Sequence, residues 1–312
     1  MRDIKTLRAY MMTLDPLHVG TGAYRLSRVD LPVLRDSGTG LPKVPGTSLS
    51  GVARAYAAMI KTVAGQPVRC AGQGKHCGTC QVCATFGTLG AEGEENATPP
   101  KTAEADQEKP KARAGMVSFF DARLMLFPVA SMAGAVWVTS SAALAEAGVP
   151  APNPERGEVL FTGDWGAGVL NLGWLLLKTK KLDTAAWRSP WPTPWWGVIG
   201  KHIAVVNDAL FSSIVDRNME VRTSVSIDPE TGAAKSGFLF TYEAVPRSAV
   251  FAFDLVENIY RAFPPPGPSA GPWESPLEVA LAGLALADRL GVGGMGTRGF
   301  GRVQVVQSAK AA

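Results

Sequence analysis

The sequence has few or none of several features that define common protein classes. Only three His occur in 312 residues, and the sequence shows no paired His of the kind that ribonuclease-style acid–base chemistry uses. No GxxxxGK[ST] motif is present, which argues against a P-loop nucleotide triphosphatase. No stretch of about 18 uninterrupted apolar residues occurs, and the N-terminus lacks the pattern of a signal peptide. We therefore expect a cytoplasmic protein with no membrane partner.

The four Cys are also few, and all lie within fourteen positions, as Cys70, Cys77, Cys80 and Cys83. Because disulfides are rare in the cytoplasm, the spacing C-x6-C-x2-C-x2-C is more typical of a metal site. Four thiolates can form a closed zinc site that stabilises an insertion too small for its own core. His76 could replace one sulfur, and an iron–sulfur cluster or unmetallated thiols are alternatives. We expect a structural Zn²⁺.

The chain does have enough apolar residues for a full core, at 46% of the sequence. This amount suits one elaborated domain or two smaller ones. The formal net charge of +4 is modest. It permits an anionic partner without proving one, because net charge affects association and not fold.

Apolar periodicity predicts the regular elements. The clearest is a helix that Thr47 or Ser48 caps, because apolar residues recur every three or four positions from Leu49 to Val63. Further helices are expected at 207–216 and 277–290, and strands at 6–14, 116–127, 135–139, 220–227, 238–242, 249–256 and 302–306. The periodicity alone indicates an α+β fold, and the order of the elements favours a βαββαβ, ferredoxin-like core with insertions.

Three insertions are expected, at 65–115, 141–200 and 217–243. The first holds the Cys cluster and, at 91–114, a charged, Pro-bearing stretch that we expect to be mobile. The second has an irregular pattern of Trp and Pro from position 151, which favours loops packed on the core over stacking on single-stranded bases. The third is a β-hairpin with a turn signal at 228–232, and its simplest interpretation is an ordinary sheet hairpin.

The long connection at 16–54 is the first candidate binding segment. Ordering so long a loop costs backbone entropy, which favours a functional role. Gly20 and Gly22 permit close backbone approach to a ligand, while three basic residues can meet phosphates. These basic residues are Arg28, Arg35 and Lys43. Asp30 lies among them, and its carboxylate would repel a phosphate chain unless a metal ion or a reacting hydroxyl required it.

The Gly-rich segment at 291–301 is the second candidate. Its backbone N–H groups could bind phosphate. A Gly-rich segment does not by itself establish a phosphate site, and this one follows a helix C-terminus, which repels anions.

These segments carry a resemblance to a known family. The resembling stretches are VDLPV, GLP, PGTSLSGVAR, SFFDARLMLFPVASMAGAVWVTS and GVGGMGTRGFGR. Together they resemble the RAMP superfamily of CRISPR proteins, and within it the repeated backbone nuclease subunit of type III-B (Cmr) effector complexes. Ser50 departs from the family, which often has Lys there, so the resemblance implies no phosphate contact at this position.

The resemblance implies a single RAMP domain over 1–312, with a ferredoxin-like (RRM-like) palm and a thumb formed by the 217–243 hairpin. It implies a subunit that binds a guide crRNA and cleaves complementary single-stranded target RNA at regular intervals. Asp30 matches the acid required for cutting, with Mg²⁺ or another divalent cation beside it, and His18 matches a nearby family position. Products would carry a 2′,3′-cyclic phosphate and a 5′-hydroxyl. The expected RNA-binding residues are Gly20, Gly22, Arg28, Arg35, Lys43, Ser48, Arg54, Arg222, Gly293, Gly294, Gly296 and Arg298.

The implied partners are copies of the chain in a helical backbone and other Cmr-type subunits. Three alternatives stay open. The first is a non-cleaving guide-RNA scaffold of the same superfamily, in which Asp30 is a loop residue. The second is the equivalent type III-A backbone subunit. The third is a zinc-bearing adaptor that binds no RNA, which would leave the basic loop unexplained.

Overall fold

The computed structural model describes residues 4–22, 29–63, 78–88, 112–164, 168–183, 193–267 and 270–307. Its internal contacts divide the chain into two units. The first comprises Met1–Thr6, Gly46–Phe120 and Leu255–Leu286, and the second comprises Leu7–Pro45, Asp121–Asp254 and Ala287–Ala312. Among the described residues, no helix is both long and apolar enough to cross a membrane.

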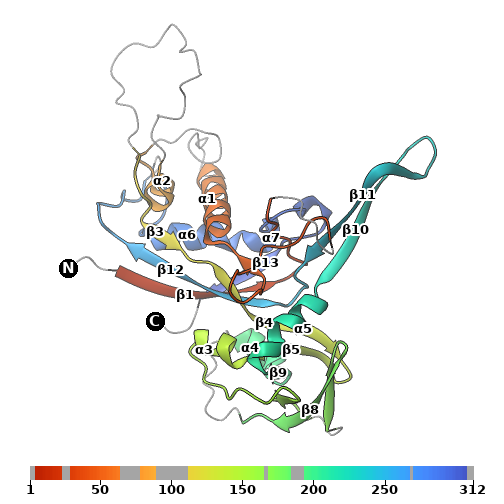
Figure 1. Cartoon of the computed structure of the whole chain (residues 1–312). Helices are drawn as coiled ribbons and strands as arrows, with labels where there is room; N and C mark the ends of the chain where they lie inside the picture. The colour runs from red at the N-terminus through yellow and green to blue at the C-terminus, as the bar shows by residue number, and fades with distance from the viewer. Residues whose placement is uncertain are drawn as a thin grey trace, which may run out of the picture. The chain divides into compact units, whose positions relative to one another are not determined.

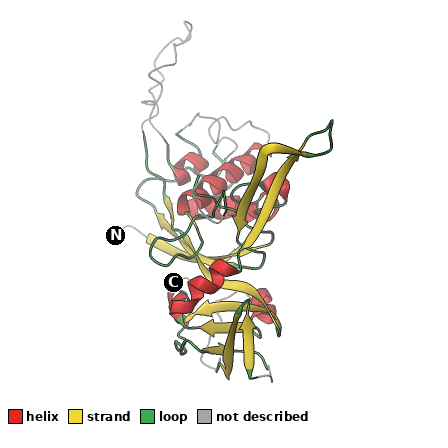
Figure 2. Ribbon diagram, turned by 45° about the vertical axis from the view of Figure 1, so that its right-hand side comes forward, coloured by secondary structure: helices red, strands yellow, loops and turns green. Residues whose placement is uncertain are grey.

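The first unit contains three helices and a short strand pair. The helices are α1 (Gly46–Val63), α2 (Gln81–Phe86) and α6 (Pro276–Ala285). Strand β3 (Val117–Phe119) pairs antiparallel with the last residues of β12 (Val250–Asn258). The helix α1 contacts α6 closely, and Figure 2 shows the helices in red.

Small residues bring α1 and α6 together. Leu49, Ala53 and Ala57, four residues apart, form the buried face of α1. Gly283 of α6 lies against this face, and a Cβ atom at Gly283 would be 2.0 Å from the Ala53 carbonyl oxygen. Since no side chain fits in that space, the helix contact depends on glycine.

The second unit is built on a long mixed sheet (Figure 1). In spatial order its strands are β13 (Val303–Gln307), β1 (Ile4–Thr13), β12, β4 (Ala122–Ser131), β5 (Gly134–Ser140), β9 (Ile203–Val206), β6 (Glu158–Phe161), β8 (Leu175–Lys181) and β7 (Val169–Leu172). The pairs β5–β9 and β6–β8 are parallel. The two-residue strand β2 (Lys43–Val44) pairs with β4.

The chain order of the main elements agrees with the sequence prediction. Strand β1, helix α1, strands β4 and β12, helix α6 and strand β13 follow one another in βαββαβ order. Their four strands are also neighbours in the sheet, in the order β13-β1-β12-β4. The α+β class is thereby confirmed, and the elements from β5 to β11 are inserted between β4 and β12.

Short helices complete the second unit. They are α3 (Ser141–Glu146), α4 (Thr193–Ile199), α5 (Asp208–Arg217), α7 (Ala287–Leu290) and the 3₁₀ turn η2 (Gly296–Arg298). Asn207 caps α5, because its side chain accepts the Ala209 N–H at 3.1 Å. One core of buried residues in this unit lies around Tyr10, Trp137 and Ile203.

Strands β10 (Glu220–Ile227) and β11 (Ala234–Ala244) form a separate two-stranded antiparallel sheet. This confirms the predicted hairpin. Figure 1 shows it as a long ribbon whose turn lies far from β4, β5 and β9 of the same unit. Val225 and Leu239 face each other across the strands, and they are 40% and 66% exposed. The hairpin therefore presents apolar surface to solvent.

Several predicted boundaries were wrong. Helix α1 begins at Gly46, so neither Thr47 nor Ser48 is its cap. The predicted helix 277–290 is two helices, because the Leu286 N–H bonds the Gly283 carbonyl in a tighter turn.

The predicted strand 116–127 is also divided, into β3 and β4. Asp121 lies between the two strands, and its carboxylate accepts a hydrogen bond from the Lys43 ammonium at 2.7 Å. Arg123, two positions further on, pairs with Glu146 at 3.4 Å.

The irregular interpretation of 151–200 is wrong as well, since this stretch contains β6, β7, β8 and α4. Strands as short as four residues leave too little alternation to detect. Trp195 is buried, in agreement with the packing interpretation. Most of the 91–114 stretch lies outside the described residues, so its predicted mobility stays a prediction.

Candidate functional site

The N-terminal loop is held along strand β11. Leu17 and Val245 exchange two backbone hydrogen bonds, at 2.8 and 2.9 Å. Further along the loop, Leu31 forms a parallel bridge to Tyr242, donating to the Thr241 carbonyl and accepting from the Glu243 N–H, both at 3.1 Å. The loop therefore behaves as an added strand at the base of the hairpin, and His18 and Asp30 each lie beside one of these attachments.

His18 is buried, and its ring is fixed by the backbone. The distance from its Nδ1 to the Glu243 carbonyl oxygen is 2.6 Å. Because a carbonyl only accepts, Nδ1 carries a hydrogen, and in the neutral ring Nε2 is an acceptor. A Cβ atom at Gly20 would lie 2.9 Å from Nε2. The glycine thus keeps this nitrogen uncovered.

The Gly-rich segment meets His18 from the other side. The Gly294 N–H donates to the His18 carbonyl at 2.9 Å. Gly293 has φ +83°, and a Cβ atom there would lie 2.4 Å from the same oxygen. Only glycine suits this position, for both reasons. A pocket of about 330 Å³ results, lined by His18, Gly20, Thr21, Gly22, Leu31, Pro32 and Gly294.

Asp30 is exposed and directly precedes the pocket residue Leu31. Its Oδ2 accepts two hydrogen bonds from Thr241, from the backbone N–H at 2.7 Å and from the hydroxyl at 2.9 Å. These bonds, the backbone one first, lower the pKa of the Asp30 carboxyl below its usual value. Asp30 is therefore a carboxylate at neutral pH, in a fixed orientation.

Glu243 of β11 links the hairpin to the loop through its side chain. Its carboxylate is buried, at 8% side-chain exposure, and accepts from the Arg35 guanidinium at 2.7 Å and from the Val33 N–H at 3.2 Å. Arg35 also contacts Asp216 at 3.0 Å and the Gly40 carbonyl at 3.1 Å. The structure thus gives Arg35 an internal role in addition to the predicted phosphate contact.

An aromatic cluster supports the site. Tyr242 and Phe300 are buried with Ala244, and Leu31, Phe240 and Met295 pack on them. Two predicted RNA-binding cations lie on these rings: Arg222 is 4.6 Å from the Phe300 centroid, and Arg298 is 5.7 Å from that of Phe240. Both arginines are exposed, but Arg222 also pairs with Glu220 at 2.5 Å, so among the described residues Arg298 is the one of the two that no carboxylate pairs.

The other predicted site residues are more scattered. Lys43 is paired with Asp121, and this hydrogen bond raises the pKa of the Lys43 ammonium. Ser48 and Arg54 belong to α1 in the first unit. Gly22 lines the pocket and Gly296 begins η2. Arg28 lies outside the described residues.

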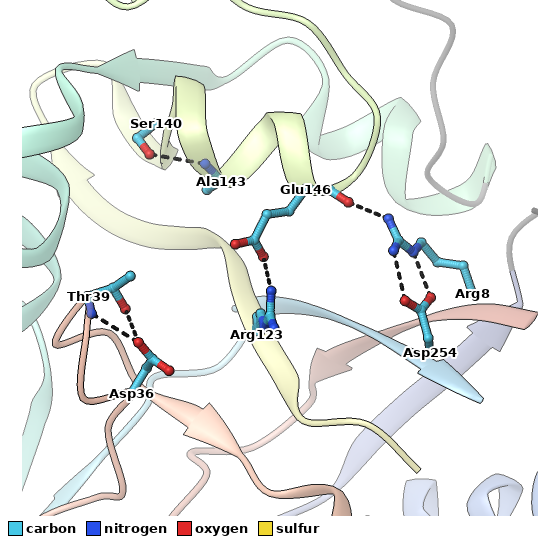
Figure 3. Close-up of polar contacts among 8 residues, drawn as sticks. All are labelled: Arg8, Asp36, Thr39, Arg123, Ser140, Ala143, Glu146 and Asp254. Carbon is cyan, nitrogen blue, oxygen red and sulfur yellow. Dashed lines mark hydrogen bonds and ion pairs between the residues drawn. The ribbon is translucent and has the colours of Figure 1, made fainter. Parts of the chain in front are cut away.

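A larger pocket of about 540 Å³ lies elsewhere in the second unit, between the loop at Asp36 and the start of α3. Figure 3 shows its polar groups paired among themselves: Asp36 with Thr39, and Arg123 with Glu146. Arg8 beside them binds Asp254 through two hydrogen bonds, at 2.8 and 2.9 Å. No sequence-based candidate except Lys43 lies in this pocket.

Only Cys80 and Cys83 of the predicted metal site are described; Cys70 and Cys77 lie outside the described residues. Both sulfurs are buried at the start of α2, and Cys80 Sγ accepts the Cys83 N–H at 3.4 Å. Within the described residues no group of three metal-ligating side chains occurs.

Sequence reasoning missed Thr241 and Glu243. Both are more than 200 positions from the loop residues that they bind. Strand β11 was predicted, but which of its side chains would meet Asp30 depends on a pairing that leaves no local pattern.

The sequence matches the RAMP superfamily over residues 10–304. The chain therefore belongs to this superfamily, as its motifs indicated. Among curated proteins, the CRISPR system Cmr endoribonuclease Cmr4 of Pyrococcus furiosus is 27% identical, over 78% of this chain and 80% of that protein. The chain is thus similar to Cmr4, the protein whose type the motifs had suggested.

Solved structures share the fold. The apo state of a type III-B Cmr-beta complex contains a chain with a TM-score of 0.62 and 16% identity, covering 99% of both chains. Oligomeric Cmr4 from Pyrococcus furiosus gives a TM-score of 0.61 at 18% identity, over 97% of this chain and 98% of that one. At these identities the likeness supports the fold alone.

Proposed function

We propose that this chain is a guide-RNA-binding backbone subunit of a type III CRISPR effector complex and cleaves complementary single-stranded target RNA. The superfamily membership and the similarity to Cmr4, which is named an endoribonuclease, support the class. The observation that carries the cleavage is the fixed, ionised Asp30 beside the His18 pocket, at the base of a projecting hairpin. In this reading the βαββαβ core is the palm and the hairpin is the thumb.

The two glycine-rich segments and the arginines would hold RNA. Gly20, Gly22 and Gly294 line a pocket without bulky side chains, where a nucleotide can approach the backbone. Arg222 and Arg298 are exposed at the hairpin base and can meet phosphates. The exposed pair Val225 and Leu239 offers an apolar surface for an unstacked base. The hairpin would thereby displace a base pair and bend the target.

Asp30 would act on the bent target. Its carboxylate accepts the proton of the 2′-hydroxyl while the 2′-oxygen forms a bond to the adjacent phosphorus and the bond to the 5′-oxygen breaks. The leaving 5′-oxygen takes a proton from water, so the products are a 2′,3′-cyclic phosphate and a 5′-hydroxyl. His18 Nε2 is a hydrogen-bond acceptor in the neutral ring and would orient a ribose hydroxyl in the pocket.

The site also suits a divalent cation. Mg²⁺ is commonly held by one or two carboxylates together with phosphate oxygens and water. Asp30 Oδ1 has no hydrogen bond to the described residues, so it can serve as such a ligand. When bound, the cation would stabilise the charge that develops on the phosphate.

A structural zinc ion is a separate part of the proposal. Cys80 and Cys83 fit it, because both sulfurs are at one helix start and a backbone N–H supports the Cys80 sulfur. Cys70 and Cys77 would complete the ligand set. The ion would stabilise the 65–115 insertion and have no part in cleavage.

The proposed partners are guide crRNA, target RNA, further copies of the chain and other Cmr-type subunits. The relatives support this: one structure is oligomeric Cmr4, and another is a type III-B Cmr-beta complex bound to cognate target RNA. A type III-A assembly is the alternative setting for the same activity.

One observation favours a non-cleaving scaffold as the second candidate. Both Asp30 hydrogen bonds from Thr241 cap the edge of β11, a purely structural use of the carboxylate. In that case Asp30 would only fasten the loop to the hairpin.

The test is Asp30→Ala in the assembled complex with complementary RNA and Mg²⁺, under single-turnover conditions. We expect cleavage to slow by about a hundredfold or more, while RNA affinity stays equal or improves slightly because a negative charge is removed. Asp36→Ala is the matched control, because Asp36 also accepts backbone hydrogen bonds in the same loop. Parental cleavage by Asp30→Ala would support the scaffold instead.

A further inference from the structure

Thr241 and Asp30 form a reciprocal contact across 211 positions of sequence. The Thr241 N–H and hydroxyl both donate to Asp30 Oδ2, and the Asp30 N–H donates back to the Thr241 hydroxyl oxygen at 3.1 Å. Three hydrogen bonds thus join one loop residue to one strand residue. Nothing else among the described residues bonds the Asp30 side chain.

This contact fixes a side chain that would otherwise rotate. Asp30 is exposed, and an exposed Asp without partners samples several rotamers. A group that reacts must be held close to one geometry, because small displacements of reacting atoms cost large factors in rate. With Oδ2 bonded to Thr241, Oδ1 keeps one direction.

The anchor itself is rigid because of its neighbours. The residues that follow Thr241 in β11 are buried: Tyr242 packs with Phe300, and Glu243 binds Arg35. Across the hairpin, Thr241 pairs in register with Thr223 of β10. The Thr241 position is therefore set by the base of the hairpin and not by the loop.

We propose that Thr241 is a positioning residue for target cleavage: strand β11 holds the Asp30 carboxylate ready through the Thr241 hydroxyl. The proposal rests on the proposed function, since it assigns to Asp30 the role given there. It adds that the hairpin has two tasks, because the element that would bend the RNA also orients the group that reacts with it.

Substitution of Thr241 tests this in the assembled complex. Thr241→Val keeps the shape but removes the hydroxyl, and with it two of the three hydrogen bonds. We expect single-turnover cleavage of target RNA to fall about tenfold, with unchanged RNA affinity and unchanged cut positions. Thr241→Ser restores the hydroxyl and should cut within about twofold of the parent. Thr223→Val is the control, because it makes the same change on the opposite strand without touching Asp30.

A double substitution separates the possible failures. If Thr241 acts through Asp30, then Thr241→Val should cause no further loss in an Asp30→Ala background. A further loss there, equal losses in Thr223→Val, or no rescue by Thr241→Ser would overturn the positioning role. Parental cleavage by Thr241→Val beside an inactive Asp30→Ala would overturn it too, and would leave the proposed function standing. Parental cleavage by Asp30→Ala would instead defeat the proposed function itself.

Discussion

At the scale of single residues, the buried carboxylate of Glu243 is a charge near the site that needs a compensating partner. Burying a charge is costly unless a partner compensates it, and Arg35 is that partner. Arg35 is itself only 25% exposed. Removing the guanidinium would leave Glu243 unpaired in the protein interior.

We therefore expect Arg35→Ala to lower the free energy of unfolding by about 2–3 kcal/mol, somewhat below the cost of breaking a fully buried pair. Urea denaturation measures it. Arg289→Ala is the control, since Arg289 is 80% exposed and 3.9 Å from Asp288, and it should change stability by less than about 0.5 kcal/mol. An Arg35→Ala protein with parental stability but a reduced salt dependence of RNA binding would instead place Arg35 on a phosphate.

The pair of Asp15 and Arg302 gives a pH-dependent prediction. The Arg302 guanidinium donates to both Asp15 oxygens, at 2.5 and 3.1 Å, and this lowers the pKa of the Asp15 carboxyl. A lowered pKa in the folded state means that the pair stabilises the protein above the ordinary Asp pKa. That stabilisation is lost as the pH falls through the lowered value.

Asp15→Asn should accordingly lower the melting temperature by about 1–3 °C at pH 7. The difference from the parent should shrink as the pH falls below the ordinary Asp pKa and through the lowered pKa of the Asp15 carboxyl. Thermal melting at a series of pH values measures it, with Asp164→Asn as the control, because both side chains of the Asp164–Lys181 pair are largely exposed. A difference that persists at low pH would show that Asp15 acts through packing and not through charge.

At the scale of elements, the contact between α1 and α6 makes two Gly→Ala substitutions act in opposite directions. Gly283→Ala should destabilise the protein by about 3 kcal/mol, because its Cβ would meet the Ala53 carbonyl at 2.0 Å. Gly51→Ala on the exposed side of α1 meets nothing within 4 Å and should stabilise by about 0.5–1 kcal/mol. The midpoints of urea denaturation of the two variants measure these changes. If both substitutions changed stability equally, the contact between α1 and α6 would not depend on Gly283.

Elements with a strong local pattern could be predicted from the sequence, and the others could not. Helix α1 shows its buried face as a clear period, and Asn207 marks the start of α5 by its capping side chain. Strands β6 and β7 have only four residues each, too few for alternation to stand out among Pro and Trp. The division of 277–290 depends on one tightened turn that helix propensity does not encode.

For the candidate site, the loop with His18 and Asp30 could be predicted because its glycines and charges are adjacent in sequence. The residues of β11 that hold this loop could not be predicted. Thr241 and Glu243 reach the loop through a parallel bridge at Leu31, and such a pairing is specified by tertiary packing and not by either segment alone.

At the scale of the whole molecule, two of the Cys residues proposed as zinc ligands are also part of a hydrophobic core. Cys80 and Cys83 are buried with Ala57 of α1 and with Trp273 and Val279. A change at the two sulfurs would therefore alter the packing of α1 and α6. The second unit has a separate core around Tyr10.

Metal analysis should give about one zinc per chain, and the protein should be colourless. Zinc removal by a chelator should speed hydrogen exchange in α1 and α6 and leave β5 and β9 of the second unit unchanged. Cys80→Ser should do the same without chelator. Exchange followed by mass spectrometry measures it, and a brown protein that contains iron would replace zinc by a cluster.

The attachment of the loop to β11 ends at Thr241, while the turn at Asp228–Gly232 lies at the far end of the hairpin. Residues can therefore be added to the turn or removed from it in pairs without altering the register at Thr241. The length of the hairpin and the position of the Asp30 carboxylate can therefore be changed independently. Hairpins of different lengths could be exchanged in this chain by protein engineering while the Asp30 carboxylate stays in place.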